Sequence, residues 1–250
     1  MIDITHRGAV AILTMAYGKA NLFDLEFCGA LDAAFERCRP ASISAVVITG
    51  RGSIFSGGVD LVRVMNEGQP YIDAFLPVMS RTFETIFAFP KPVVAAVNGH
   101  AIAGGCILAC AADYRLMARG GGRIGVPELV VGVPFPTVPF EIVRFTVAPQ
   151  HLATLIYEGE TLVADAAAER GFVDAAVDAD RLLDDAIAAA GRLAARPAVA
   201  FAMTKNQLRA GALERMRDGA ERVDPNTQQL WSAPETVAAI RSYVERTLKK

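Results

Sequence analysis

The sequence predicts an α/β fold with a mostly parallel sheet, followed by a helical C-terminal region. In the first part of the chain, short apolar runs of strand length alternate with helical segments, which implies crossover connections between parallel strands. From about Val138 onward the pattern is helical, with little strand signal. Apolar residues make up 52% of the 250 residues and charged residues 21%, so the chain can bury a sizeable core.

The first elements follow from apolar patterning and from one helix cap. Gly8–Met15 reads as a short strand, and Leu25–Cys38 as an amphipathic helix with Asp24 as its N-cap. The uninterrupted apolar run Ser44–Gly50 predicts a strand buried on both faces. A loop punctuated by glycines follows, over Gly50–Leu61.

The middle of the chain contains the most apolar stretch, Pro92–Ala112, which is long enough to suggest a membrane span. The turn-forming pair Asn98-Gly99 interrupts it, so we expect a buried strand and a buried helix instead. No transmembrane segment is predicted. The elements expected around it are a helix near Tyr71–Phe87, a strand at Pro92–Val97, a helix starting at Gly104-Gly105 and a strand at Tyr114–Ala118.

The C-terminal part divides at a proline. The alanine-rich stretch Asp184–Ala195 carries charges at helical spacing, and Pro197 restarts a helix that runs through Leu208. We therefore expect a core domain over residues 1–195 and a helical region over residues 196–250.

Composition excludes several classes of function. A net charge of −2 and a pI near 6.0 argue against a nucleic-acid partner. The four cysteines lack zinc-ligand spacing, and no metal site is predicted; Cys106 and Cys110 read as small core residues. Few cysteines and no signal peptide indicate a cytoplasmic location.

Two glycine segments invite a functional interpretation. Ser56–Leu61 ("SGGVDL") and Ala103–Cys106 ("AGGC") each follow a strand and could each direct a backbone N–H into a shared cavity. The second N–H would lie at a helix N-terminus, which favours negative charge. The alternative is that the glycines only permit close packing of strand and helix, and spacing alone favours this alternative.

Five motifs stand out in order along the chain: "GKANLFD", "FSGGVDL", "KPVVAAVNGHAIAGGCILACAADYRLMA", "VPELVVGV" and "SAPETVAAIRSYVER". Together they resemble the crotonase (enoyl-CoA hydratase/isomerase) superfamily. The resemblance implies a ββα spiral core with C-terminal trimerisation helices, assembled as a homotrimer or a dimer of trimers. It also implies an acyl-CoA thioester as substrate, with CoA present only as part of that substrate and no separate cofactor.

The resemblance assigns roles to individual positions. The oxyanion-hole donors are the N–H groups of Val59 and Gly104, and Asp60 caps the helix that follows. The family usually has three glycines at the second segment, where this chain has Ala103-Gly104-Gly105. Because the middle glycine is retained, we expect an intact oxyanion hole.

The acidic positions differ from those of family hydratases, which use two glutamates to hold and split water. The second is present as Glu128 in "VPEL", whereas the first position is Ile107. A single carboxylate suffices to move a proton from C2 to C4 of a 3-enoyl thioester. The pattern is thus closest to the enoyl-CoA isomerases, with hydration, another enolate reaction, or acyl-CoA binding without turnover as alternatives.

Other residues complete the predicted site. The segment Val133–Phe140, which includes Phe135, forms either a stiff apolar wall of the acyl pocket or a rigid packing loop. Asp113 and Glu141 are possible secondary acids, of which Asp113 more plausibly ends a helix and Glu141 has helix-surface spacing. The histidines, among them His100 in a buried turn, are weak candidates. By family analogy, CoA contacts come from the backbone of Lys19 and Ala20 and from Tyr243 and Arg246 on a C-terminal helix that can reach a neighbour's ligand.

Overall fold

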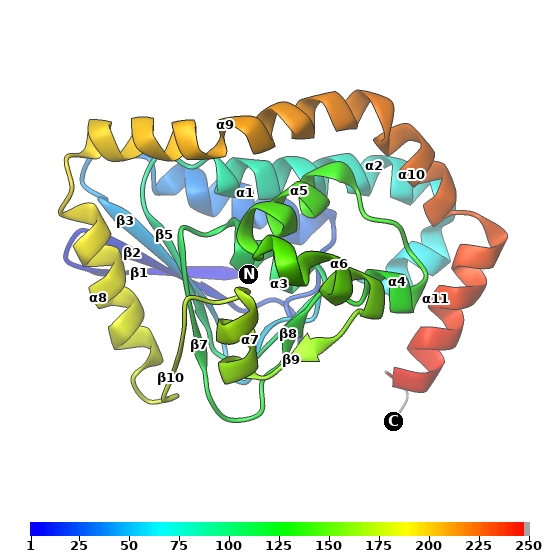
Figure 1. The fold of residues 1–250 in the computed structure, drawn as a ribbon, viewed down its shortest axis with the longest axis horizontal. Coiled ribbons are helices and arrows are strands. Elements are labelled where there is room, and N and C mark those ends of the chain that lie inside the picture. Colours follow the sequence, from blue (N-terminus) through cyan, green and yellow to red (C-terminus); the bar gives the residue numbers. More distant parts are fainter. Residues whose placement is uncertain (248–250) are drawn as a thin grey trace.

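The structure, a computed structural model, describes residues 1–247, and a six-stranded sheet forms its centre (Figure 1). Five strands run parallel, and only the first pairs antiparallel with its neighbour. In spatial order the strands are β1 (Ile2–Arg7), β2 (Val10–Met15), β3 (Ala45–Gly50), β5 (Val93–Val97), β7 (Tyr114–Ala118) and β10 (Ala175–Val177). The predicted α/β class with a mostly parallel sheet is confirmed.

Alternation along β3 shows why the sheet is buried on both faces. Val46 and Ile48 point into the larger core with the first three helices, whereas Ala45 and Val47 point to the opposite face with Ala186. Each face is therefore covered by helices, which explains the continuous apolar run in the sequence. The covering helices are α1 (Leu25–Arg37), α2 (Leu61–Phe87) and α3 (Gly104–Ala111) on one face and α8 (Leu182–Ala194) on the other.

A second, four-stranded sheet lies beside the main one and was not predicted. Its strands are two or three residues long, too short for a periodic signal. They are β4 (Ile54–Ser56), β6 (His100–Ile102), β8 (Ile124–Gly125) and β9 (Thr161–Leu162). Strands β4 and β6 are parallel neighbours, so the chain leaves both in the same direction. This arrangement brings the two glycine segments together.

The remaining helices follow in the second half of the chain, as expected. They are α4 (Glu128–Val131), α5 (Thr137–Thr146), α6 (Pro149–Glu158), α7 (Ala164–Arg170), α9 (Ala198–Arg222), α10 (Asp224–Trp231) and α11 (Pro234–Thr247). Helix α9 crosses the molecule beside α2 and α5, and α10 and α11 then turn down along the end that holds α4 (Figure 1). The division at residues 195 and 196 falls in the turn between α8 and α9, and its interpretation as a domain boundary stays a prediction.

A buried ion cluster attaches α9 to the core. The Asp113 carboxylate lies 2.7 Å from the Lys205 ammonium and 2.9 Å from the Arg209 guanidinium, and both cations are buried. Asp113 also accepts a hydrogen bond from the Val93 N–H at 2.8 Å. As expected, Asp113 stands between the end of α3 and the start of β7.

Local predictions were confirmed where the signal was strong. The Asp24 carboxylate accepts from the Phe27 N–H at 2.7 Å and caps α1, and all residues of β3 are buried. Helix α2 begins at Leu61 rather than near Tyr71, with a break at Gly68, where φ is 65°. That glycine and the nearby Pro70 hid its first turns in the sequence.

Two strands of the main sheet were not predicted, and one predicted helix is longer than expected. Strand β1 was missed because its residues are largely exposed and carry little apolar signal. Strand β10 is only three residues long and half-buried, yet it extends the main sheet beside β7. Helix α9 continues well beyond Leu208, to Arg222. Residues 248–250 of the predicted C-terminal region lie outside the described residues.

Candidate active site

The first glycine segment presents the amide of Val59. The extended chain here pairs with Phe23, whose N–H donates to the Gly58 oxygen at 2.7 Å and whose oxygen accepts from the Asp60 N–H at 3.0 Å. Because neighbouring amides in extended backbone point to opposite sides, the Val59 N–H points away from Phe23. Within residues 1–247 it donates no hydrogen bond.

The second segment presents the amide of Gly104, the first residue of α3. Its N–H also has no acceptor in the described part of the chain, as befits the first turn of a helix. A Cβ placed on Gly58 would lie 3.3 Å from the Gly104 nitrogen, so the two segments touch. Val59 and Gly104 line one pocket, and the pair of free amides predicted from the sequence is therefore brought together.

The glycines around these amides allow neighbouring backbone segments to pack closely against each other. Gly58 has a φ of 90°, and a Cβ on it would lie 2.7 Å from the Ile102 oxygen. A Cβ on Gly105 would lie 2.3 Å from the Ser56 oxygen, so α3 can pack on β4 only without a side chain there. Gly105 is therefore required for close packing of α3 on β4. This packing role is compatible with the presence of the two free amides of Val59 and Gly104.

Ala103 replaces the first glycine that the family usually has, and its backbone keeps a glycine-like conformation. Its φ of 51° and ψ of −120° lie in a region that an alanine adopts at a cost. The Ala103 N–H donates to the Gly125 oxygen at 2.9 Å, and the Ala103 oxygen accepts from the Ile107 N–H at 3.0 Å. The surrounding bonds hold this residue and the Gly104 amide beside it in place.

The "GKAN" segment forms hydrogen bonds with the residues that precede the Val59 amide. Ser56 donates through its hydroxyl to the Asn21 oxygen at 2.7 Å, and the Asn21 side-chain amide donates to the Phe55 oxygen at 3.0 Å. The Gly57 N–H donates to the Ala20 oxygen at 2.8 Å. Asp60 accepts from the Arg63 N–H at 3.0 Å and caps α2, as predicted.

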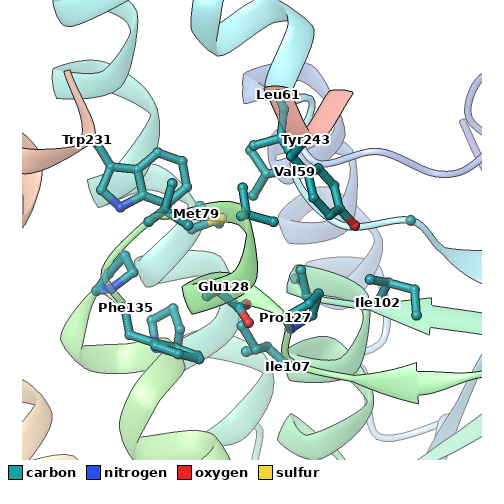
Figure 2. A pocket seen from close by; sticks show the side chains of 17 residues that line it. Val59, Leu61, Met79, Ile102, Ile107, Pro127, Glu128, Phe135, Trp231 and Tyr243 are labelled. Carbon is teal, nitrogen blue, oxygen red and sulfur yellow. The ribbon is translucent and has the colours of Figure 1, made fainter. Parts of the chain in front are cut away.

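Glu128 provides the carboxyl group of the pocket. It is the first residue of α4, only 6% exposed, and its Oε2 atom is buried with no hydrogen-bond partner. Burial raises the pKa of Glu128 from about 4.5 to about 8, because the ionised form loses its hydration. Figure 2 shows the side chain of Ile107 beside this carboxyl group, as predicted from the sequence.

The pocket is otherwise apolar and spans about 570 Å³, including its open mouth. Among its lining residues, only Glu128 and Tyr243 carry ionisable side chains. Burial raises the pKa of Tyr243, so its hydroxyl stays protonated near neutral pH. Within residues 1–247, the lining therefore offers one carboxyl group, that of Glu128, and no second one.

The predicted substrate contacts fall into two groups. Ile107, Phe135 and Tyr243 line the pocket. The apolar wall predicted for Val133–Phe140 is present, and the same segment also packs on the C-terminal helices, since the Pro134 oxygen accepts from Trp231.

Of the predicted CoA contacts, only Tyr243 lines the pocket. Lys19 and Arg246 are exposed and do not line it, and Ala20 only abuts Gly57 from behind. Tyr243 was expected from a helix that can reach a neighbour's ligand, but here it faces the pocket of its own chain. The remaining CoA contacts stay predictions.

Several pocket residues were missed by sequence reasoning, and two of them are large and buried. Met79 of α2 and Trp231 of α10 line the pocket, and both are nearly fully buried. Their positions depend on how α2 and α10 pack, which no local motif encodes. The only available signal was that Trp231 is the single tryptophan of the chain.

The reserve candidates lie elsewhere. Glu141 was expected on a helix surface but is buried. Its carboxylate forms ion pairs with Arg215 at 2.7 Å and with Arg144 at 3.1 Å. His100 is exposed in β6 rather than buried in a turn. Neither lines the pocket, and the paired arginines explain the burial of Glu141.

Two further features concern metals and membranes. In residues 1–247, no group of three or more His, Cys, Asp or Glu side chains is placed to hold a metal ion. No single helix of this part is apolar and long enough to cross a bilayer, although α8 and α9, joined by a 100° bend, meet that criterion as a pair. The stretch Pro92–Ala112 divides into β5, β6 and α3.

Comparison with known proteins finds relatives in sequence and in fold. A crotonyl-CoA hydratase of Syntrophomonas wolfei is 30% identical over 165 residues, which cover 66% of this chain and 63% of the hydratase. A Mycobacterium tuberculosis protein solved as an enoyl-CoA isomerase is 31% identical, with a TM-score of 0.82 over 88% of this chain and 96% of that one. A second structure of the same protein names it a probable enoyl-CoA hydratase. The human mitochondrial Δ3-Δ2-enoyl-CoA isomerase superposes with a TM-score of 0.95 over 99% of this chain and 98% of that one at 22% identity, which supports the fold alone.

The family model for enoyl-CoA hydratase/isomerase matches residues 5–249, nearly the whole chain. Its members act on acyl-CoA thioesters, and the crotonase-like fold with a helical C-terminal region agrees with the architecture described above. The match, the pair of free amides and the buried glutamate lead to one conclusion: this chain belongs to the enoyl-CoA hydratase/isomerase family.

Proposed function

We propose that the protein is a Δ3,Δ2-enoyl-CoA isomerase, in which Glu128 acts alone as base and then as acid. The observation that carries this proposal is a single buried carboxyl group, whose Oε2 atom has no hydrogen-bond partner, in an apolar pocket lined by two free backbone amides. The similarity to the M. tuberculosis protein, which is named both an isomerase and a probable hydratase, supports enoyl-CoA as the substrate class.

The proposed reaction begins with the thioester oxygen between the N–H groups of Val59 and Gly104. The Glu128 carboxylate removes a proton from C2, which the carbonyl group and the C3–C4 double bond both acidify. Negative charge passes to the thioester oxygen, where two preorganised donors stabilise it; losing one such donor typically costs about 3 kcal/mol of barrier. The Glu128 carboxylic acid then returns the proton at C4, which gives the conjugated trans-2-enoyl thioester.

Hydration of a 2-enoyl thioester is the second candidate, because the curated relatives carry hydratase or dehydratase names. That reaction needs a second polar group to hold water beside Glu128. Ile107 fills the expected position with an apolar side chain that cannot hold water. We therefore expect isomerase activity to exceed hydratase activity.

The test is a pair of assays on the purified enzyme. Trans-3-hexenoyl-CoA is followed by the appearance of the conjugated thioester, and trans-2-hexenoyl-CoA by its loss on hydration. We expect isomerisation, and Glu128→Gln should lower its rate by about 100-fold to 10,000-fold. Glu141→Gln is the matched control, because Glu141 is also a buried glutamate but does not line the pocket. Hydration without isomerisation would refute the proposal.

We also propose the wider context that the resemblance implies. The enzyme would act in the cytoplasm as a homotrimer or a dimer of trimers, with no cofactor beyond the CoA of its substrate. Lys19, Ala20 and Arg246 would contact the CoA portion outside the pocket. Light scattering after size-exclusion chromatography tests the assembly, and a monomer at assay concentration would contradict it.

A further inference from the structure

The pocket has an open end and a closed end, with Glu128 between them. The lining residues at the open end are all partly exposed: Gly57, Leu61, Ile102, Ala103 and Tyr243. Those at the closed end are buried, apart from the partly exposed Phe135: Met79, Val131, Val133, Pro136, Pro139 and Trp231. A ligand that enters at the open end thus meets a wall beyond Glu128.

Figure 2 shows the same division around the carboxyl group. Trp231, Met79 and Phe135 lie on one side of Glu128. Ile102 and Tyr243 lie on the other side. A thioester bound at the Val59 and Gly104 amides, with its CoA portion toward the open end, directs its acyl chain toward Trp231.

Trp231 is held rigidly in this wall. It is 3% exposed, and its indole N–H donates to the Pro134 oxygen at 2.9 Å. Pro134 belongs to the proline-rich segment that forms one side of the pocket, so the ring is fixed between that segment and α2. A buried indole whose polar atom is satisfied leaves only apolar surface for the ligand.

The closed end contains no group that could pair with a charge. Within residues 1–247, the pocket lining beyond Glu128 is entirely apolar. A carboxylate at the end of an acyl chain would lose its hydration there without compensation, which is strongly unfavourable.

We propose that Trp231 terminates the acyl site and restricts the substrate to uncharged chains of short to medium length. This inference rests on the proposed function only for the position of the thioester at the two amides. It does not depend on whether the enzyme isomerises or hydrates the bound chain.

The first experiment uses Trp231 itself as a probe, because it is the only tryptophan of the chain. Wild-type enzyme is titrated with CoA, acetyl-CoA, hexanoyl-CoA and adipoyl-CoA, none of which is an isomerase substrate. Hexanoyl-CoA should change the tryptophan emission, whereas CoA and acetyl-CoA should leave it unchanged. Adipoyl-CoA has the same chain length with a terminal carboxylate and should bind about 100-fold more weakly than hexanoyl-CoA.

The second experiment enlarges the closed end. In Trp231→Leu, the ratio of kcat/KM for trans-3-dodecenoyl-CoA to that for trans-3-hexenoyl-CoA should rise at least about tenfold. Phe89→Leu removes a similarly buried aromatic outside the pocket and should leave the ratio unchanged. If the enzyme hydrates but does not isomerise, the ratio of kcat/KM for the C12 and C6 chains is measured with 2-enoyl thioesters instead. The inference about chain length can then fail or hold independently of the proposed reaction.

Three outcomes would overturn the inference. One is binding of hexanoyl-CoA, measured by calorimetry, without any change in tryptophan emission. Another is equal affinity for hexanoyl-CoA and adipoyl-CoA. The third is a chain-length ratio that Trp231→Leu does not alter.

Discussion

Ile107 of α3 lies beside the Glu128 carboxyl group of α4, whose Oε2 atom is buried without a hydrogen-bond partner (Figure 2). Ile107 is 3% exposed and excludes water from one side of the carboxyl group. The resulting desolvation raises the pKa of Glu128 to about 8. A carboxyl group with a pKa near neutrality can both accept a proton from the substrate and return it. The proposed reaction requires both steps of Glu128.

Isomerase activity should follow the ionisation of Glu128. Because the carboxylate is the reacting base, kcat/KM for trans-3-hexenoyl-CoA should rise with pH and level off above about 8. In Ile107→Asn, a polar side chain would hydrate the carboxylate and move this midpoint to lower pH, whereas Ile107→Val should leave it in place. A midpoint near pH 4.5 in the wild type would contradict the account.

Glu128 should also make the folded state less stable at high pH. Its pKa is raised in the folded protein, so the folded state holds a proton that the unfolded state has lost between about pH 4.5 and pH 8. The free energy of unfolding therefore falls as pH rises through this range, by at most about 1.4 kcal/mol per unit of pKa displacement.

Glu128→Gln removes this penalty. Urea unfolding should show that the variant and the wild type differ little near pH 5, and that the variant is more stable by a few kcal/mol at pH 9. A difference that does not grow between the two pH values would show that Glu128 is not desolvated.

Ala103→Gly should stabilise the protein. Ala103 has a φ of 51°, which a glycine adopts without the steric cost borne by alanine. The relief is partly offset by the greater freedom of glycine in the unfolded chain, so we expect a net gain of about 1 kcal/mol in the free energy of unfolding. A loss of stability in thermal or urea unfolding would show that this conformation is not strained.

Gly105→Ala and Gly104→Ala should differ in severity. The new Cβ at residue 105 would lie 2.3 Å from the Ser56 backbone oxygen, whereas at residue 104 the nearest atom is a Phe23 ring carbon at 3.2 Å. Backbone must move in the first case, and a small ring displacement suffices in the second. We expect Gly105→Ala to cost about 3 kcal/mol in urea unfolding and Gly104→Ala less; the reverse order would contradict this packing.

Asp113→Asn should destabilise the attachment of α9 strongly. Asp113 neutralises Lys205 and Arg209, and both cations are buried. Its removal leaves two uncompensated positive charges, which we expect to cost about 3 kcal/mol in the free energy of unfolding. Lys205→Met should be nearly neutral, because Asp113 retains Arg209 as its partner; equal losses in the two variants would contradict this assignment.

The parts of the fold that the sequence predicted are those with local signals. The apolar run of β3, the cap at Asp24 and the turn at Asn98-Gly99 each determine their own conformation. Strands of two or three residues, such as β8, form only through pairing with neighbours and leave no pattern. The start of α2 was hidden because Gly68 interrupts it.

The site divides in the same way. The Val59 and Gly104 amides, Ile107 and Glu128 belong to short motifs, and the structure brings all four into one pocket. Trp231 reaches that pocket only because α10 folds back over α2. The position of Trp231 in the pocket wall depends on tertiary packing. No sequence motif could therefore predict the closed end of the acyl site.

The most direct test follows an isotope through the reaction. Trans-3-hexenoyl-CoA that carries deuterium at C2 is converted in ordinary water, and deuterium at C4 of the product is measured by mass spectrometry and NMR. A single buried Glu128 predicts that part of the label moves from C2 to C4 within one molecule, and that Glu128→Gln abolishes the transfer. Complete replacement by solvent hydrogen at C4, or label transfer that persists in Glu128→Gln, would contradict the one-carboxylate mechanism.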